Sequence, residues 1–189
     1  MSTRLPVLTT ARLVVRPFAL DDLDACHRTL DGDAGGGRSR DQRAAWLDWT
    51  VRSYDELAAL YQPPYGDRAV ALRDGGELVG AVGLVPVLAP LDRLRAYGGD
   101  VAADHLRPEV GLFWATAAAH RRRGYAAEAA AALIDHAFGA VGLRRIVALT
   151  ERDNLASQAV MRRLGMAIED NPRPDPPWFQ VAGVLDTRP

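Results

Sequence analysis

The stretch Arg121-Arg122-Arg123-Gly124-Tyr125-Ala126 decides the fold, together with the alanine-rich run 127–138 that follows it. A strand-like segment, 109–114, comes just before, so a strand, a basic glycine turn and a helix follow one another. The first N–H groups of a helix have no partner within the helix, and the helix dipole is positive there. Gly124 lets the backbone approach a ligand closely because it has no Cβ. This order of elements predicts a binding site for an anion such as a phosphate.

The segments around this turn predict one domain of mixed class that covers residues 1–189. Strand-like and helix-like patterns alternate in the order β-α-α-β-β-β-α-β-α-β-β, which favours one mixed α/β sheet with helices on both faces. Strands are expected at 12–16, 68–72, 78–85, 109–114, 145–150, 166–169 and 178–185, and helices at 20–30, 39–60, 125–138 and 154–164.

Two segments carry no such pattern. The glycine-rich stretch Gly32–Arg38 is predicted to be a linker, since no strand leads into it. The segment Pro86–Pro108 is predicted to be a long polar excursion, and loops of this length usually serve a function.

The composition excludes several functions. All 23 basic side chains are arginine, so a lysine-containing phosphate loop and Schiff-base chemistry on a lysine are both excluded. The single cysteine, Cys26, fits a reducing compartment and excludes an intrachain disulfide. The net charge of -1 argues against nucleic acid as a partner. No apolar run reaches the roughly 20 residues that span a bilayer. With no signal peptide in 1–10, a cytoplasmic protein away from the membrane is expected.

Four motifs together resemble the GNAT acetyltransferase superfamily, in the form of its Rim-type ribosomal-protein N-acetyltransferases. The turn matches the family pattern Gln/Arg-x-x-Gly-x-Gly/Ala at Arg121, Gly124 and Ala126. The other three motifs are Leu8–Leu13 with Arg16-Pro17, Glu109-Val110-Gly111, and Asn154–Ser157 with Val160–Met166. The resemblance covers nearly the whole chain and implies a mostly antiparallel sheet whose two central parallel strands splay apart.

The resemblance implies acetyl-CoA as the donor. Backbone amides of the turn would hold the pyrophosphate, and the backbone of the preceding strand would run beside the pantetheine arm. Asn154 resembles the asparagine that contacts the cofactor, and Ser157, one turn on, could reach the sulfur of CoA. The residues implied to bind the cofactor are Leu112, Phe113, Trp114, Arg121, Arg122, Arg123, Gly124, Tyr125, Ala126, Asn154 and Ser157.

Direct attack of an amine on the thioester needs a group that removes a proton from the amine. Glu109 is the first candidate, because it lies at the entrance of the central strand; the alternative is an ion pair with Arg107. Glu151 and Asp153 follow the neighbouring strand and compete with it, as does a chain of water molecules.

The departing thiolate needs a proton or a hydrogen bond, and Ser157 is the catalytic candidate for this role. Many relatives carry a tyrosine acid four residues further on, where this chain has Met161, which cannot donate a proton. Asn154 could serve only as a helix cap, or as cap and cofactor contact together. His120 is interpreted as a surface residue, and the histidines show no metal-ligand spacing, so no metal is expected.

These observations predict an acetyl-CoA-dependent N-acetyltransferase whose acceptor is a primary amine, either a protein N-terminus or a small molecule. An aminoglycoside-type antibiotic acetyltransferase is a narrower alternative. A module that binds acyl-CoA without turnover is another, motivated by Met161. A nucleotide-binding oxidoreductase is disfavoured, because no Gly-x-Gly-x-x-Gly follows an early strand. A homodimer could form through the last hairpin.

Overall fold

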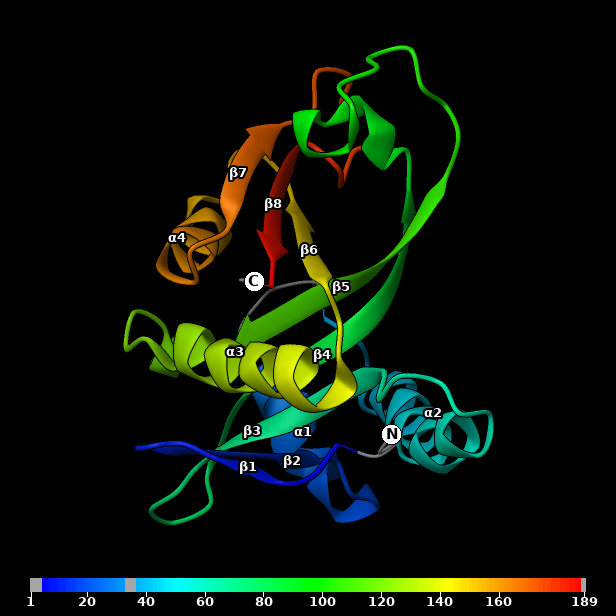
Figure 1. Cartoon of the computed structure of the whole chain (residues 1–189). Helices are drawn as coiled ribbons and strands as arrows, with labels where there is room; N and C mark the ends of the chain where they lie inside the picture. The colour runs from blue at the N-terminus through cyan, green and yellow to red at the C-terminus, as the bar shows by residue number, and fades with distance from the viewer. Residues whose placement is uncertain (1–4, 33–36, 188–189) are drawn as a thin grey trace. The chain divides into compact units, whose positions relative to one another are not determined.

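The computed structural model describes residues 5–32 and 37–187, which form two compact units (Figure 1). The first unit comprises Met1–Leu84 and Phe113–Val141, and the second comprises Val85–Leu112 and Gly142–Pro189. Two long strands, β4 (Leu78–Ala89) and β5 (Arg107–Thr116), belong partly to each unit. The strand order is β1-β2-β3-β4-β5-β6-β8-β7, a mixed and mostly antiparallel sheet, as the sequence predicts. The glycine-rich linker expected at Gly32–Arg38 lies partly outside the described residues.

The first unit is built on antiparallel strands with helices on both faces. Its strands are β1 (Leu8–Thr9), β2 (Leu13–Pro17), β3 (Gly66–Leu72) and the first part of β4. Its helices are η1 (Leu20–Asp22), α1 (Leu23–Leu30), α2 (Arg40–Ala59), η4 (Ala118–His120), α3 (Tyr125–His136) and the π-helical turn η5 (Ala137–Val141).

Apolar side chains of alternate strand positions bury one face of this sheet against α1 and α2. Ala69 and Ala81 from the strands pack with Cys26 of α1 and Leu47 of α2 in one hydrophobic cluster. Helix α3 lies on the opposite face, in front of the strands in Figure 1. Small residues such as Ala129 and Ala130, both fully buried, let that helix lie close to the strands.

The predicted start of α2 is confirmed. Ser39 is the N-cap, its side-chain oxygen accepts from the N–H of Gln42 at 3.2 Å, and the Gln42 side chain accepts from the N–H of Ser39 at 2.9 Å. This reciprocal pair is a capping box. It fixes the beginning of the helix that carries Trp46, which packs against the core, and Trp49, which is 63% exposed.

The second unit contains the parallel pair of the sheet. Its strands are the first part of β5, β6 (Arg145–Thr150), β7 (Ala167–Asp170) and β8 (Val181–Asp186), and its helices are η2 (Leu91–Arg93), η3 (Arg95–Tyr97) and α4 (Leu155–Arg163). Strands β5 and β6 are parallel and pair at Gly111 and Val147. On one face Val147 packs with Leu91 and Leu94, and on the other Met161 of α4 lies against Gly183 of β8.

Two sequence predictions for the second unit are wrong in their bounds. The polar excursion does not begin at Pro86, because β4 continues to Ala89 and β5 already begins at Arg107. Strand β3 ends its pairing opposite Leu84, so one edge of β4 has no β3 partner at Pro86, and a proline without an N–H is tolerated there. The last strand begins at Val181 rather than Trp178, since Pro176 and Pro177 keep the preceding residues in a turn.

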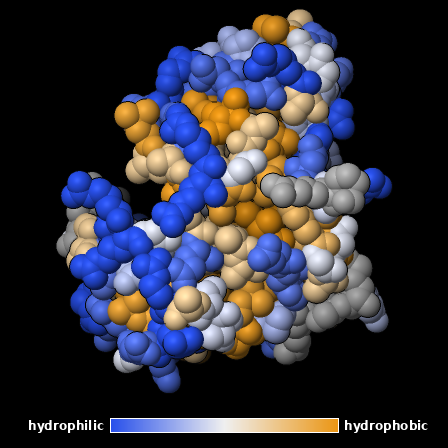
Figure 2. Space-filling model, turned by 60° about the vertical axis from the view of Figure 1, so that its left-hand side comes forward, coloured by the Kyte–Doolittle hydropathy of each residue, from blue (hydrophilic) through white to orange (hydrophobic). Residues whose placement is uncertain are grey.

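Apolar side chains also reach the surface, and Figure 2 shows hydrophobic patches among hydrophilic side chains on the face that it draws. In the described ranges 5–32 and 37–187, no helix combines the length and the apolar character that a membrane span requires.

Candidate active site

The basic glycine turn has the backbone geometry of an anion site. Arg122 has φ 60° and Gly124 has φ 82°, both in the left-handed region, and Gly124 is the N-cap of α3. The first hydrogen bond of this helix runs from the N–H of Glu128 to the carbonyl of Gly124. The amides of residues 125–127 therefore have no backbone acceptor in the described part of the chain. Successive free N–H groups beside a left-handed residue form a concave donor site for an anion.

Glu128 and Arg12 hold this turn in place. The Glu128 carboxylate accepts from the hydroxyl of Thr10 at 2.6 Å, from the backbone N–H of Arg12 at 3.0 Å and from the Arg12 Nε at 2.7 Å. The Arg12 guanidinium also donates to the carbonyl of Arg123 at 3.0 Å and lies 4.7 Å from the centre of the Tyr125 ring. The β1–β2 turn is thereby fastened to the first turn of α3.

Electrostatics strengthens this fastening. Burial raises the pKa of Glu128, but the hydrogen bonds from Thr10 and Arg12 and the charge of Arg12 outweigh it, so its pKa is lowered. The opening motif at residues 8–13 thus has a structural role that its sequence alone does not reveal. The signal is a threonine and an arginine in this motif together with a glutamate in the first turn of the helix. Thr10, Arg12 and Glu128 therefore hold the turn in position and are not expected to contact the ligand themselves.

The side chains of His120 and Cys26 are of reactive types, but the contacts of each are structural. The interpretation of His120 as a surface residue is wrong: its side chain is only 12% exposed, and its Nε2 lies 3.1 Å from Glu77 Oε1. Cys26 is fully buried, and burial raises the pKa of its thiol to about 11, so it stays protonated near neutrality. Residues 5–32 and 37–187 contain no cluster of three His, Cys, Asp or Glu side chains that could bind a metal.

In the second unit, Glu109 lies among aromatic and basic groups. Arg107 does not pair with Glu109, because it binds Asp92 at 2.7 Å. Burial raises the pKa of the Tyr97 phenol, and the charge of Glu109 raises it further. Tyr97 Oη is buried and has no partner with hydrogen-bond geometry in the described residues. Glu109 is therefore near enough to Tyr97 to act on it electrostatically without a formed hydrogen bond, and its carboxylate is half-buried.

The start of α4 is built as the sequence predicts. Asn154 is the N-cap, and its Oδ1 accepts from the N–H of Ser157 at 3.1 Å, so its capping role is confirmed. Ser157 is half-buried in the first helical turn. The rival carboxylates Glu151 and Asp153 are both exposed, just beyond the end of β6.

Met161, at the position where many relatives carry a tyrosine, is a core residue in this chain. It is fully buried, and a Cβ added to Gly183 would meet both its Cγ and its sulfur at 3.1 Å. Gly183 thus leaves room on β8 for the thioether. A side chain held in this way packs α4 on the strands and offers no proton.

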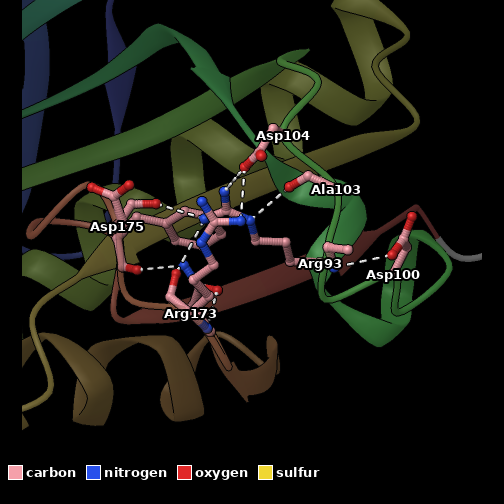
Figure 3. Close-up of polar contacts among 9 residues, drawn as sticks. Arg93, Asp100, Ala103, Asp104, Arg173 and Asp175 are labelled. Carbon is pink, nitrogen blue, oxygen red and sulfur yellow. Dashed lines mark hydrogen bonds and ion pairs between the residues drawn. The ribbon is translucent and has the colours of Figure 1, made fainter.

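Arg93 fastens the excursion between β4 and β5 to the turn between β7 and β8. Its guanidinium donates to the carbonyl of Ala103 at 2.7 Å and to the carbonyls of Arg173 and Asp175 at 3.1 and 2.7 Å. It also binds the carboxylate of Asp104 at 2.7 Å. Figure 3 shows the Arg93 head group surrounded by these acceptors from two segments, residues 103–104 and 173–175. Arg93 could not be recognised from the sequence, since three of its four acceptors belong to the backbone.

The mixed sheet has a parallel pair, β5 and β6, and a basic glycine turn that opens helix α3. This arrangement agrees with the GNAT fold that the sequence motifs indicate. The sequence model of the acetyltransferase (GNAT) domain matches residues 12–167, and the chain belongs to this family of N-acetyltransferases.

Relatives of similar length support this assignment. The chain is 27% identical over 181 residues to the uncharacterized N-acetyltransferase YoaA of Bacillus subtilis strain 168, covering 95% of this chain and 86% of the relative. The acetyltransferase of Agrobacterium tumefaciens C58 is similar in structure, with a TM-score of 0.68, 26% identity, and coverage of 97% of this chain and 95% of that one. RimL, a ribosomal L7/L12 α-N-protein acetyltransferase solved with coenzyme A, shares the fold at a TM-score of 0.62 and 14% identity, over 95% of this chain and 96% of its own.

Proposed function

We propose that this protein transfers an acetyl group from acetyl-CoA to a primary amine, by direct attack of the amine within a ternary complex. The observation that carries the proposal is the turn 121–126, with its left-handed Arg122 and Gly124 and the free amides that begin α3. The coenzyme A in the RimL structure supports the same donor for this chain, because the two share the fold.

The residues of the first unit would bind the donor. The amides of the turn would receive the pyrophosphate, with the helix dipole and the arginines adding attraction. Arg122 and Arg123 are exposed and form no ion pair in the described ranges, so both guanidiniums are available. The backbone of Leu112, Phe113 and Trp114 would lie along the pantetheine arm.

The residues of the second unit would serve the chemistry. Glu109 is the first candidate for positioning the amine or removing its proton, Asn154 for a cofactor contact, and Ser157 for a hydrogen bond to the departing sulfur. Ser157→Ala is expected to lower turnover more than affinity for acetyl-CoA. A full-rate Ser157→Ala enzyme would remove Ser157 from the mechanism.

Calorimetric titration tests the donor. The purified protein should bind acetyl-CoA and desulfo-CoA more tightly than adenosine diphosphate, since only the first two carry the pantetheine arm. Gly124→Ala should weaken this binding, whereas Gly142→Ala should not. The two glycines make a matched pair, because both have a positive φ near 80° and impose the same backbone strain on alanine. Equal affinity for all three ligands, or equal loss in both variants, would contradict the proposal.

The buried Met161 favours one alternative, a module that binds acyl-CoA without turnover. Release of CoA with a panel of amines separates the two functions, since a binding module would release none. The same panel separates the acceptors: peptides with a free N-terminus, amino sugars of the aminoglycoside type, and small amines. A homodimer through the last hairpin belongs to this proposal and is tested by sedimentation. A single domain over residues 1–189 also belongs to it and is tested by the cooperativity of unfolding.

A further inference from the structure

The carboxylate of Asp67, at the beginning of β3, is left without a partner. It is half-buried, and in the described residues it forms no hydrogen bond or ion pair. Other aspartates of the first unit are paired: Asp22 binds Arg16 at 2.7 Å, and Asp31 binds Arg43 at 2.6 Å. A carboxylate that loses part of its water shell without gaining a partner costs free energy, so its position calls for an explanation.

The backbone around Asp67 is fixed. The hydroxyl of Tyr54, from α2, donates to the carbonyl of Asp67 at 2.6 Å and accepts from the N–H of Phe18 at 3.1 Å. The carboxylate is therefore displayed from a rigid strand rather than from a loop, which suits a group that must meet a ligand in one geometry.

The Asp67 side chain lies over Gly83 of the neighbouring strand β4. In the register of β3 and β4 it pairs with Gly83, and a Cβ added to Gly83 would lie 2.8 Å from Asp67 Oδ1. The carboxylate thus covers the space that a side chain at Gly83 would occupy on β4. Strand β5 is the next strand in the sheet beyond β4. The following residues of both strands on this face, Ala69 and Ala81, pack against α1 and α2.

Phe113 of β5 lies on the side of Gly83 that faces away from β3. The N–H of Ala117 on the β5 side donates to the carbonyl of Val79 on β4 at 2.9 Å. A Cβ added to Gly80 would meet Ala115 and Thr116, and one added to Gly111 would meet Val85, so the same antiparallel register runs along both strands and Gly83 lies opposite Phe113. Strands two apart in a sheet are separated by about 10 Å, so a small group above Gly83 would be about 5 Å from both neighbours. Phe113 is 39% exposed, and its backbone is the part proposed to lie beside the pantetheine arm.

The charges around Asp67 suit a proton acceptor. Burial raises the pKa of Asp67, while Arg68 on the same strand, Arg43 on α2 and Arg38 before α2 act to lower it, and the net direction is upward. The charge of Asp67 in turn acts to raise the pKa of the buried Cys26 thiol on α1 and of the Tyr54 phenol on α2. A carboxylate with a raised pKa is a better base near neutral pH than an ordinary one.

We infer that Asp67 binds the ammonium group of the acceptor above Gly83 and accepts its proton. The inference rests on the proposed function and gives the acceptor a site in the first unit. One N–H proton passes from the ammonium to the carboxylate and then to solvent. The free amine forms the new C–N bond, the C–S bond of the thioester breaks, and the second proton leaving the nitrogen goes to the CoA sulfur.

The test compares Asp67→Asn with Asp74→Asn and Glu109→Gln. Asp74 is the matched control, because it is an exposed carboxylate in the turn that joins the same two strands. The probes are acetyl-CoA with three acceptors: a peptide with a free N-terminus, an aminoglycoside and a small alkylamine. Release of CoA is followed with a thiol reagent, and acetyl-CoA affinity is measured by calorimetry.

Asp67→Asn should lower kcat/KM for the best amine by about 100-fold or more, the usual range for a general base. Its acetyl-CoA affinity should be unchanged, and Asp74→Asn should behave as wild type. The Asp67→Asn protein should melt at the same or a higher temperature than wild type, because an unpaired desolvated charge has been removed; a purely structural residue would not combine lost activity with kept stability.

Three results would overturn the inference. A full-rate Asp67→Asn enzyme, with Glu109→Gln inactive, would assign the proton to Glu109. Binding of acetyl-CoA without turnover of any probe amine would leave Asp67 with no acceptor and would favour the binding module. No binding of acetyl-CoA by wild type would remove the proposed function itself, and the inference with it.

Discussion

Arg12 in the first unit and Arg93 in the second each hold a loop in place, but they use different acceptors. Arg12 is 47% exposed and binds one carboxylate, that of Glu128, on the helix whose first turn it secures. The Arg93 side chain is 3% exposed and donates to three backbone carbonyls as well as to Asp104. The first arrangement depends on a pair of side chains, whereas the second depends mostly on the course of the backbone.

This difference explains why one arrangement leaves a mark in the sequence and the other leaves none. An arginine and a glutamate must both be present for the first, and both belong to short motifs near residues 12 and 128. Every residue type has a backbone carbonyl, so no sequence pattern at positions 103, 173 or 175 predicts the arrangement around Arg93. The comparison also predicts that the two arginines differ in their contribution to stability and in their dependence on pH.

The largest effect is expected for Arg93→Met. Loss of the guanidinium leaves the carbonyls of Ala103, Arg173 and Asp175 without this donor, and the free energy of unfolding should fall by about 3 kcal/mol or more. Urea denaturation measures it. Arg95→Met is the matched control, because it lies two residues away with a side chain 87% exposed, and it should change stability by less than about 0.5 kcal/mol. Equal effects would refute the distinction between the sites.

A smaller effect is expected for Arg12→Met. The pair with Glu128 is partly exposed, so the free energy of unfolding should fall by about 1 kcal/mol. The affinity for acetyl-CoA should also fall, since the turn 121–126 loses its support at the Arg123 carbonyl. Arg93→Met should leave this affinity nearly unchanged at temperatures where the variant is folded. Calorimetric titration of both variants with acetyl-CoA tests whether only Arg12 supports the turn 121–126.

Asn154→Ala is expected to lower the free energy of unfolding by about 1 kcal/mol as well, through the lost cap of α4. At Asn154 a side-chain oxygen accepts from a backbone N–H, whereas at Arg93 a side-chain donor binds backbone carbonyls. If Asn154 also contacts the cofactor, the variant should bind acetyl-CoA more weakly than Asp153→Ala, its exposed neighbour. A variant with unchanged melting and unchanged affinity would have neither role.

The smallest effect is a difference in pH dependence. The pKa of Glu128 is lowered in the folded protein, so its contribution is present above the unfolded pKa, near 4.5, and is lost as the pH falls through the folded pKa. The stability difference between wild type and Arg12→Met should therefore shrink in acid. Most of the penalty of Arg93→Met should persist, since three of the four Arg93 acceptors are carbonyls, which do not titrate, and only Asp104 is a carboxylate. Melting curves at neutral and acid pH would show parallel losses if this distinction were false.

Much of the fold follows from the sequence for physical reasons. The capping box at Ser39, the glycine turn at Gly124 and the cap at Asn154 are local signals, and the structure confirms all three. The bounds near Pro86 could not be predicted, because they depend on where β3 stops pairing with β4. Asp67 could not be singled out either, since its isolation depends on a glycine sixteen residues away on another strand.

The acceptors of Arg93 have a consequence for how this chain tolerates change. Because the carbonyls of Ala103, Arg173 and Asp175 exist whatever side chains those positions carry, the loops around them are free to vary in composition while keeping one path. A single arginine can thus preserve a frame in which surrounding residues are exchanged. The side chains of these loops can then change while Arg93 is the position that must stay.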